Sequence, residues 1–255
     1  MKKIFLLTAI LGCVMLTSAN AQENWTEIGI YGMMSGIEGD TKVGNVTSDV
    51  DVSFSDILDN LDMGFMGFAE HRRGKLSFIG DAVYMKLSAD NTTSRTPITS
   101  VTLNAEFSQT IAEGFVGYRV LAQDHGDAQF GIDLLGGARY NKIELELGVE
   151  ADLLGHTAPA SRNPSEDWVD GVVAVRAQYG HNNGWGASAW ADIGDGSDSS
   201  SYQLAGFVSY RYKNNIRVFG GYRLYSFEFT GESRGNKFEL DLDYSGPMIG
   251  VSYRL

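Results

Sequence analysis

Apolar and polar side chains alternate with a period of two along most of the chain, from Trp25 to the carboxyl terminus. This period puts successive side chains on opposite faces of a β-strand. In one such segment, Tyr202 and Leu204 share one face, whereas Gln203 and Arg211 share the other. The pattern predicts ten strands, at approximately 25–36, 62–73, 75–88, 98–120, 128–148, 167–179, 184–194, 201–213, 215–230 and 237–255.

Short and long connections alternate between these strands. The short ones are 73–74, 121–127, 180–184 and 213–215, and the longer, mostly polar ones are 37–61, 89–97, 149–166, 195–200 and 231–236. Outer-membrane barrels have short periplasmic turns and longer extracellular loops, and an even strand number returns both termini to the periplasm. We therefore expect an all-β fold, a single antiparallel up-and-down transmembrane β-barrel of about ten strands, with eight or twelve as alternative counts.

The alternation continues to the last residue. Ile249, Val251, Tyr253 and Leu255 share one face. Chain ends usually fray unless they are paired, so this ending is typical of a final strand that pairs on both sides in a closed barrel.

The amino end has the three parts of a secretory signal peptide: basic Lys2 and Lys3, apolar residues 4–16, and the small-x-small site at 19–21. We expect residues 1–21 to be cleaved and 22–255 to form the barrel domain. A spanning helix is a poor alternative because it needs about 20 apolar residues. A lipoprotein signal at Cys13 is a second alternative. Cleavage at 21 removes this cysteine, the only one in the chain, and with it any thiol chemistry.

The amino-acid composition argues against nucleic-acid binding and against a disordered chain. The signal peptide contains two lysines and no acidic residue, so its removal takes the net charge from -12 to -14. So acidic a chain is a poor binder of nucleic acid. The 31 glycines and 4 prolines favour many strands over disorder.

Charged side chains lie at strand centres on the face opposite the apolar one. We expect this face to line the lumen, with lipid outside, although alternation alone also fits a soluble barrel with its faces inverted. The candidate lumen residues are Glu113, Arg119, Asp133, Arg139, Asp170, Arg176, Asp192, Arg211, Arg217 and Arg223. They predict either an interlocked network that fills a narrow barrel or rings of charge in a small-solute pore.

Two neighbouring strands change character partway. In 98–120, apolar Leu103 and Phe107 share the parity of charged Glu113 and Arg119. A β-bulge pair that exchanges the faces, or strands that extend above the membrane, would produce this pattern.

Segment 54–61 within the first long connection has a serine suited to capping and an apolar stripe of Ile57, Leu58 and Leu61. It predicts a short helix, either in an outer loop or folded into the lumen as a constriction.

No catalytic, cofactor or metal site is expected. His71, His125 and His181 fall at predicted periplasmic turns and His156 in an outer loop, away from any plausible nucleophilic serine. The histidines also lack metal-ligand spacing.

The chain resembles porin-like outer-membrane β-barrel proteins of Gram-negative bacteria. The residues that carry the likeness are Asp56-Ile57-Leu58-Asp59-Asn60-Leu61, Gly136-Gly137-Ala138-Arg139-Tyr140, Asp167-Trp168-Val169-Asp170, Gly221-Tyr222-Arg223, Ser245-Gly246-Pro247 and Gly250-x-x-Tyr253-x-Leu255. The resemblance implies location in the cell outer membrane after secretion across the inner membrane, contact with its lipid and lipopolysaccharide, and recognition of the C-terminal strand by the barrel-assembly machinery. Such proteins usually end in Phe or Trp, and this chain ends in Leu255.

The expected function is a structural barrel or a small-solute, porin-like channel with a polar, charged lumen. The alternatives are a lipid-modifying outer-membrane barrel enzyme and a secreted soluble β-barrel that binds a small ligand.

Overall fold

The computed structural model describes residues 24–43, 46–96, 99–153, 156–162, 165–213, 215–233 and 236–255. The signal peptide expected over 1–21 lies outside these described residues.

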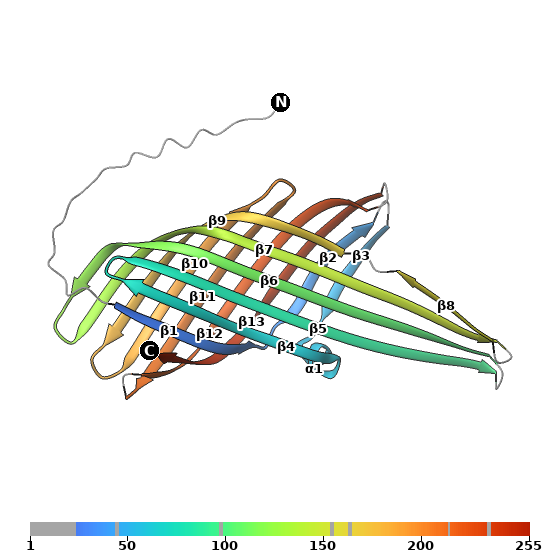
Figure 1. Ribbon diagram of the computed structural model, residues 1–255, viewed down its shortest axis with the longest axis horizontal. Helices are drawn as coiled ribbons and strands as arrows, with labels where there is room; N and C mark the ends of the chain where they lie inside the picture. Colours follow the sequence, from blue (N-terminus) through green and yellow to red (C-terminus); the bar gives the residue numbers. More distant parts are fainter. Residues whose placement is uncertain are drawn as a thin grey trace, which may run out of the picture.

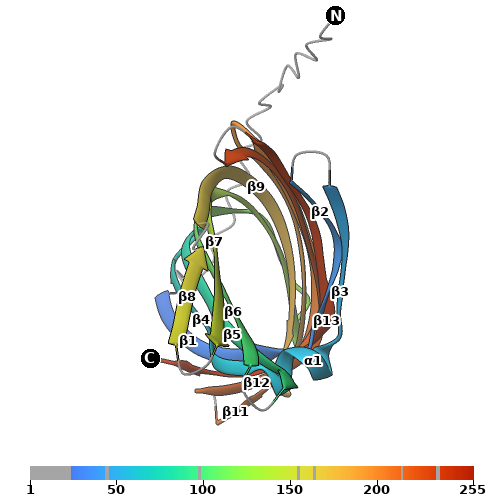
Figure 2. The ribbon, with the colours of Figure 1, turned by 90° about the vertical axis from the view of Figure 1, so that its right-hand side faces the viewer.

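Ten antiparallel strands form a closed barrel (Figures 1 and 2). They are β1 (Asn24–Met33), β4 (Leu61–Arg73), β5 (Leu76–Thr96), β6 (Thr99–Asp124), β7 (Ala128–Leu153), β9 (Ser165–His181), β10 (Trp185–Asp195), β11 (Ser199–Tyr212), β12 (Ile216–Ser233) and β13 (Asn236–Arg254). Each strand pairs with the next, and β13 closes the ring on β1 from Glu27↔Arg254 to Met33↔Met248. At the chain end, the Leu255 amide still donates to the Thr26 carbonyl at 2.8 Å. The predicted barrel and its closing strand are confirmed.

Further strands extend this sheet where loops were expected. After a break at Met34 and Ser35, β2 (Gly36–Val43) continues the pairing of β1 with β13 in the same register. A hairpin then leads to β3 (Val46–Val52), and β8 (His156–Arg162) pairs with β7. The expectation of loops over 37–61, 89–97 and 149–166 was therefore largely wrong. Figure 1 shows β5, β6 and β7 extending far past the other strands, at the end away from the short turns.

The short helix is present as α1 (Phe54–Asp59). Ser53 caps it: its hydroxyl accepts from the Asp56 amide at 3.2 Å, and its own amide donates to the Asp56 carboxylate at 3.2 Å. Ile57 is buried among interior side chains, whereas Leu58 is exposed. The helix thus combines the two predicted placements, since it stays at the rim of the barrel and inserts one side chain.

The outer surface of the barrel is apolar. Side chains such as Ile30, Val173 and Ile193 are 58 %, 60 % and 64 % exposed, while Asp133 and Arg139 inside are 0 % exposed. This is the reverse of a soluble barrel, so the inverted alternative is wrong and the band is a lipid-facing surface. In the part of the chain that the structure describes, no helix has the length and hydropathy needed to span a membrane.

The faces of β6 and β7 do not exchange partway. β6 keeps one register with β5 from Ser100 to Tyr118 and one register with β7 from Thr99 to Arg119, and the register shifts lie outside these ranges, at Thr99 against β5 and between Arg119 and Leu121 against β7. Phe107, Ile111 and Glu113 therefore all face inward. Of the two explanations predicted for this segment, the bulge pair is wrong, whereas the strands do extend far past the rest of the barrel. What changes is the chemistry of the interior, which is charged near the short turns and apolar toward the far end.

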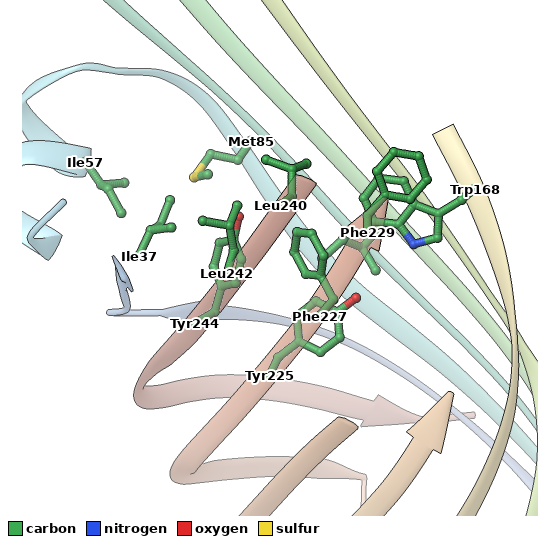
Figure 3. Packing of buried hydrophobic residues seen from close by; sticks show 11 residues of the cluster. Ile37, Ile57, Met85, Trp168, Tyr225, Phe227, Phe229, Leu240, Leu242 and Tyr244 are labelled. Atoms are coloured by element: carbon green, nitrogen blue, oxygen red, sulfur yellow. The ribbon is translucent and has the colours of Figure 1, made fainter. Parts of the chain in front are cut away.

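Most of the buried apolar side chains of the interior form one cluster, here called the outer cluster, inside the far half of the barrel (Figure 3), and Phe115, Leu135, Val172 and Ala174 form a second, smaller one. The outer cluster is described first. The members of the outer cluster are Ile37, Ile57, Met85, Ile111, Trp168, Tyr225, Phe227, Phe229, Leu240, Leu242 and Tyr244. Trp168 of β9 stacks on Phe229 of β12 with ring centroids 4.4 Å apart. Two strands, β10 and β11, separate β9 from β12, so this contact joins parts of the wall that are not paired with each other.

Candidate functional site

All ten charged residues chosen from the sequence lie on the inner face of the sheet. Seven are buried and three are half-buried. The buried ones are Glu113, Asp133, Arg139, Asp170, Arg176, Asp192 and Arg223, and the half-buried ones are Arg119, Arg211 and Arg217. They gather into three groups along the barrel axis.

The first group surrounds Asp133 of β7. Its carboxylate accepts from Arg72 at 2.6 Å and from Arg176 at 2.8 Å, and it also pairs with Arg119. Arg176 in turn makes a two-point pair with Glu70, with both N···O distances at 2.8 Å. The guanidinium fork suits such bidentate pairing. This group ties β4, β6, β7 and β9 together across the interior.

The second group surrounds Glu27 of β1, near the short turns. Its carboxylate pairs with Arg217 at 2.6 Å and Arg211 at 2.8 Å, and it accepts from the Ser252 hydroxyl at 2.6 Å. Arg254 lies 3.5 Å from the same carboxylate. Glu27 therefore holds β11, β12 and β13 to the first strand.

The third group lies just below the outer cluster. Arg139 pairs with Glu113 and, at 2.8 Å, with Asp192, and its guanidinium lies 4.9 Å from the centre of the Tyr225 ring. Among the described residues, serine hydroxyls rather than an arginine hold Asp170: Ser199 and Ser201 both donate to its carboxylate, Ser201 at 2.9 Å. Burial of these charges is compensated within the group.

Between the groups lies a chamber of about 170 Å³. Glu70, Arg176 and Arg217 line it on the side of the short turns, and Arg223 and Glu113 line it on the far side. Aromatic side chains such as Phe68, Phe207 and Phe219 form its walls. It is a small space between two layers of ion pairs.

Three buried charged residues of the network, Glu27, Glu70 and Arg72, were not among those predicted from the sequence. All are buried, with exposures of 2 %, 7 % and 1 %. The signal was present, because each alternates with lipid-facing neighbours such as Ile28 and Ala69 in the same period of two. All three lie on β1 and β4, the first two strands of the barrel.

The sequence matches no protein-family model and none of the curated proteins. Among solved structures, the chain resembles the outer membrane protease OmpT from Escherichia coli, with a TM-score of 0.56 and 9 % identity over 93 % of this chain and 99 % of that one. Ail, the attachment invasion locus protein of Yersinia pestis, aligns with a TM-score of 0.39 and 11 % identity over 91 % of this chain and 99 % of that one.

The fold is that of an outer-membrane β-barrel protein. The apolar outer band agrees with it, and the predicted location in the outer membrane is confirmed. Barrels of this kind sit among the lipids and lipopolysaccharide of that membrane.

The network has the energetic character of a structural element. Taking charges out of water is costly, and only close pairing with satisfied hydrogen bonds offsets the cost. Among the described residues, no group of His, Cys, Asp or Glu has an arrangement suited to a metal ion. The carboxylates of the first two groups instead have arginine partners, so the network holds opposite walls at a fixed separation.

Proposed function

We propose that this protein is a structural outer-membrane barrel whose axis is closed to solutes, rather than an open porin-like channel. The observation that carries the proposal is the position of Arg176, which joins Glu70 of β4 to Asp133 of β7 across the interior. A solute that moves along the axis would have to break this layer.

The environment of the charges supports closure. In a channel, rings of charged side chains face water and select ions by their field. Here Arg72 and Asp133 are 1 % and 0 % exposed, and they form an ion pair at 2.6 Å instead of facing water. The outer cluster adds a second, apolar barrier, in which Phe227 is 1 % exposed. Ten strands enclose only a little more space than eight, whose inward side chains fill the lumen.

We further propose that the barrel is not an enzyme. His71, His125 and His181 lie at the end with the short turns, and His71 Nδ1 contacts the Thr26 hydroxyl at 2.9 Å in an exposed position. A serine nucleophile needs a histidine that is itself oriented by an acid. Assays with ester and peptide substrates test this part of the proposal. If substrate is turned over and the activity remains after the histidines are replaced, the activity comes from another site.

The C-terminal strand is the proposed contact with the barrel-assembly machinery. It is paired on both sides in the finished barrel, so recognition must precede closure. Leu255→Phe restores the usual terminal aromatic residue. We expect it to assemble faster in vitro with the reconstituted machinery and liposomes.

Planar-bilayer recording tests closure directly. The mature chain is refolded, its folding is checked by heat-modifiable gel mobility, and single insertions are recorded. We expect no resolvable steady current from the folded protein. Regular conductance steps that scale with the amount of folded protein would overturn the proposal.

A further inference from the structure

The pairing of the barrel wall is incomplete at one place. β1 pairs with β4 from Asn24↔Arg73 only as far as Ile30↔Gly67. Beyond this point β1 stays paired with β13 to Met33, and β4 stays paired with β5 to Leu61. Segments 31–34 and 61–66 therefore form two facing edges that do not pair with each other.

This break lies within the lipid-facing band. Met63 and Phe65 on one edge are 59 % and 54 % exposed, and Met34 on the other edge is 43 % exposed. The neighbouring Ile249 of β13 is 61 % exposed. Gly32, on the edge of β1, has no atom within 4 Å of the position that a Cβ would take. Strand edges in hydrocarbon leave backbone groups without partners, so such an edge requires a cover or lines a cavity.

A cavity of about 310 Å³ occupies this place. Its lining includes Met34, Leu58 and Ile249 from the outer surface together with Ile111 and Arg223 from the interior. A cavity lined from both faces of a sheet passes through the sheet. The volume is within the range of small-ligand pockets.

Helix α1 borders the cavity on the far side. Phe54, Ile57 and Leu58 all line it, and Ile57 also anchors the helix in the outer cluster. Figure 2 shows α1 at the rim between the β2–β3 hairpin and the β4–β5 pair, and Figure 3 shows Ile57 directed toward Ile37 and Met85. The helix thus covers the opening without filling it.

The two ends of the cavity differ in chemistry. The lipid end is lined by methionine, leucine and isoleucine side chains. The inner end presents the Tyr31 hydroxyl and Arg223, which is buried and whose Nε has no hydrogen-bond partner among the described residues. The same two residues line the chamber, so the cavity adjoins it.

Charge at the inner end disfavours an anionic ligand. Asp81 and Glu113 already lie beside Arg223. The neighbouring Arg139 is shared between Glu113 and Asp192. Carboxylates therefore outnumber guanidinium groups here, and a further negative charge would be repelled. An uncharged hydroxyl group can accept from Arg223 Nε and donate to the Tyr31 oxygen, whose own proton goes to the Asp81 carboxylate at 2.8 Å.

We propose that this opening is a lateral binding site for a single hydrocarbon chain with an uncharged polar end, which enters from the surrounding lipid. The chain replaces the missing contact between the two edges, and its polar end reaches Tyr31 and Arg223. This goes beyond the proposed structural role and does not depend on whether the axis conducts.

Native mass spectrometry of the folded, mature protein provides the test, with 1-dodecanol, dodecanoate and dodecane as separate probes. We expect 1-dodecanol to be retained in preference to the other two. Gly32→Phe places a ring at the mouth of the cavity and should lower dodecanol affinity about tenfold, about 1.4 kcal/mol of binding free energy.

Gly136→Phe is the matched control. Gly136 also lies on the outer face with no atom within 4 Å of its Cβ position, but on β7, away from the opening. The Gly136→Phe variant should bind dodecanol with the same affinity as the unaltered protein. Equal retention by both variants, stronger binding of dodecanoate, or no retention by the unaltered protein would each overturn the proposal. If a variant fails the gel-mobility check of folding, the comparison of the three probes on the unaltered protein still tests the proposal.

Discussion

Arg176 of β9 and Glu70 of β4 form a two-point ion pair across the inside of the barrel, with both N···O distances at 2.8 Å. Three strands, β5, β6 and β7, separate them around the wall. The pair is therefore a strut between distant strands rather than a link between neighbours. Both side chains are 9 % exposed, so water screens their attraction little.

Removal of one partner of this strut should be costly. Arg176→Met leaves Glu70 buried with Arg72, at 3.5 Å, as its remaining ion-pair partner among the described residues. We expect a loss of about 3–5 kcal/mol in the free energy of unfolding, measured by urea titration in detergent. Lys86→Met is the control, because its pair with Glu106 is exposed and should be worth about 0–1 kcal/mol. Similar losses for the two variants would contradict the role of Arg176.

Two adjacent glycines of β7 should differ in their tolerance of a methyl group. A Cβ on inward-facing Gly137 would collide with the Gly114 carbonyl oxygen and the Phe115 ring, whereas one on outward-facing Gly136 would meet open space. We expect Gly137→Ala to cost about 1–3 kcal/mol through overpacking. Gly136→Ala should leave the unfolding curve unchanged. Equal unfolding curves for the two variants would contradict this prediction, because they would show that neighbouring strands accommodate the methyl group without loss of stability.

Much of this fold follows from local pattern. The period of two is a property of each strand alone, so the ten inward charges were identified from single segments. The way these charges group in space could not be identified from single segments, because Asp133 meets Arg72 only through the stagger of strands around a closed barrel. That stagger is a property of the whole ring and leaves no trace in any one strand.

The far end of the barrel was less predictable for a different reason. Segment 89–97 is rich in Asp, Asn, Thr and Ser, which favour turns, yet Ala89 to Ser94 pair in register with 100–105 of β6. Strand pairing satisfies the backbone there although the side chains are polar. The break between β1 and β4 is likewise invisible in sequence, since both edges keep their alternation.

Acidic residues face each other across the extended hairpin, outside the membrane. Asp40 of β2 lies directly opposite Asp49 of β3 and Asp241 of β13. Asp40 is exposed, and its hydrogen bond to the Asp49 carboxyl, followed by slight desolvation and the like charges of both neighbours, raises the pKa of Asp40 above its ordinary value. A carboxyl with a raised pKa in the folded state opposes folding when ionised, and this penalty disappears as the pH falls through that pKa.

The hairpin should therefore be more stable in mild acid than at neutral pH. Hydrogen exchange of β2 and β3, corrected for the intrinsic pH dependence of exchange, should show greater protection as the pH falls from 7 toward the carboxyl range. Asp40→Asn should raise protection at pH 7 and flatten the dependence. The control Asp198→Asn lies in the exposed connection between β10 and β11 and should leave the pH dependence of hairpin protection unchanged. A hairpin that loses protection in acid would contradict this prediction.

Two neighbouring residues of α1 should contribute very differently to its attachment. Ile57 is 6 % exposed and packs in the outer cluster, whereas Leu58 is 52 % exposed. Ile57→Ala removes buried apolar surface and leaves a cavity, so we expect it to weaken docking of the helix by about 2–5 kcal/mol. Leu58→Ala keeps the helix and its Ser53 cap and should change docking little.

Hydrogen exchange resolves this effect from global stability. In Ile57→Ala the amides of α1 should exchange faster, while those of β9 to β12 keep their protection, because a short rim segment can open alone. If α1 stays protected in Ile57→Ala, the Ser53 cap and the strands on either side hold it without the buried anchor. Loss of protection throughout the barrel would instead make Ile57 part of the global core.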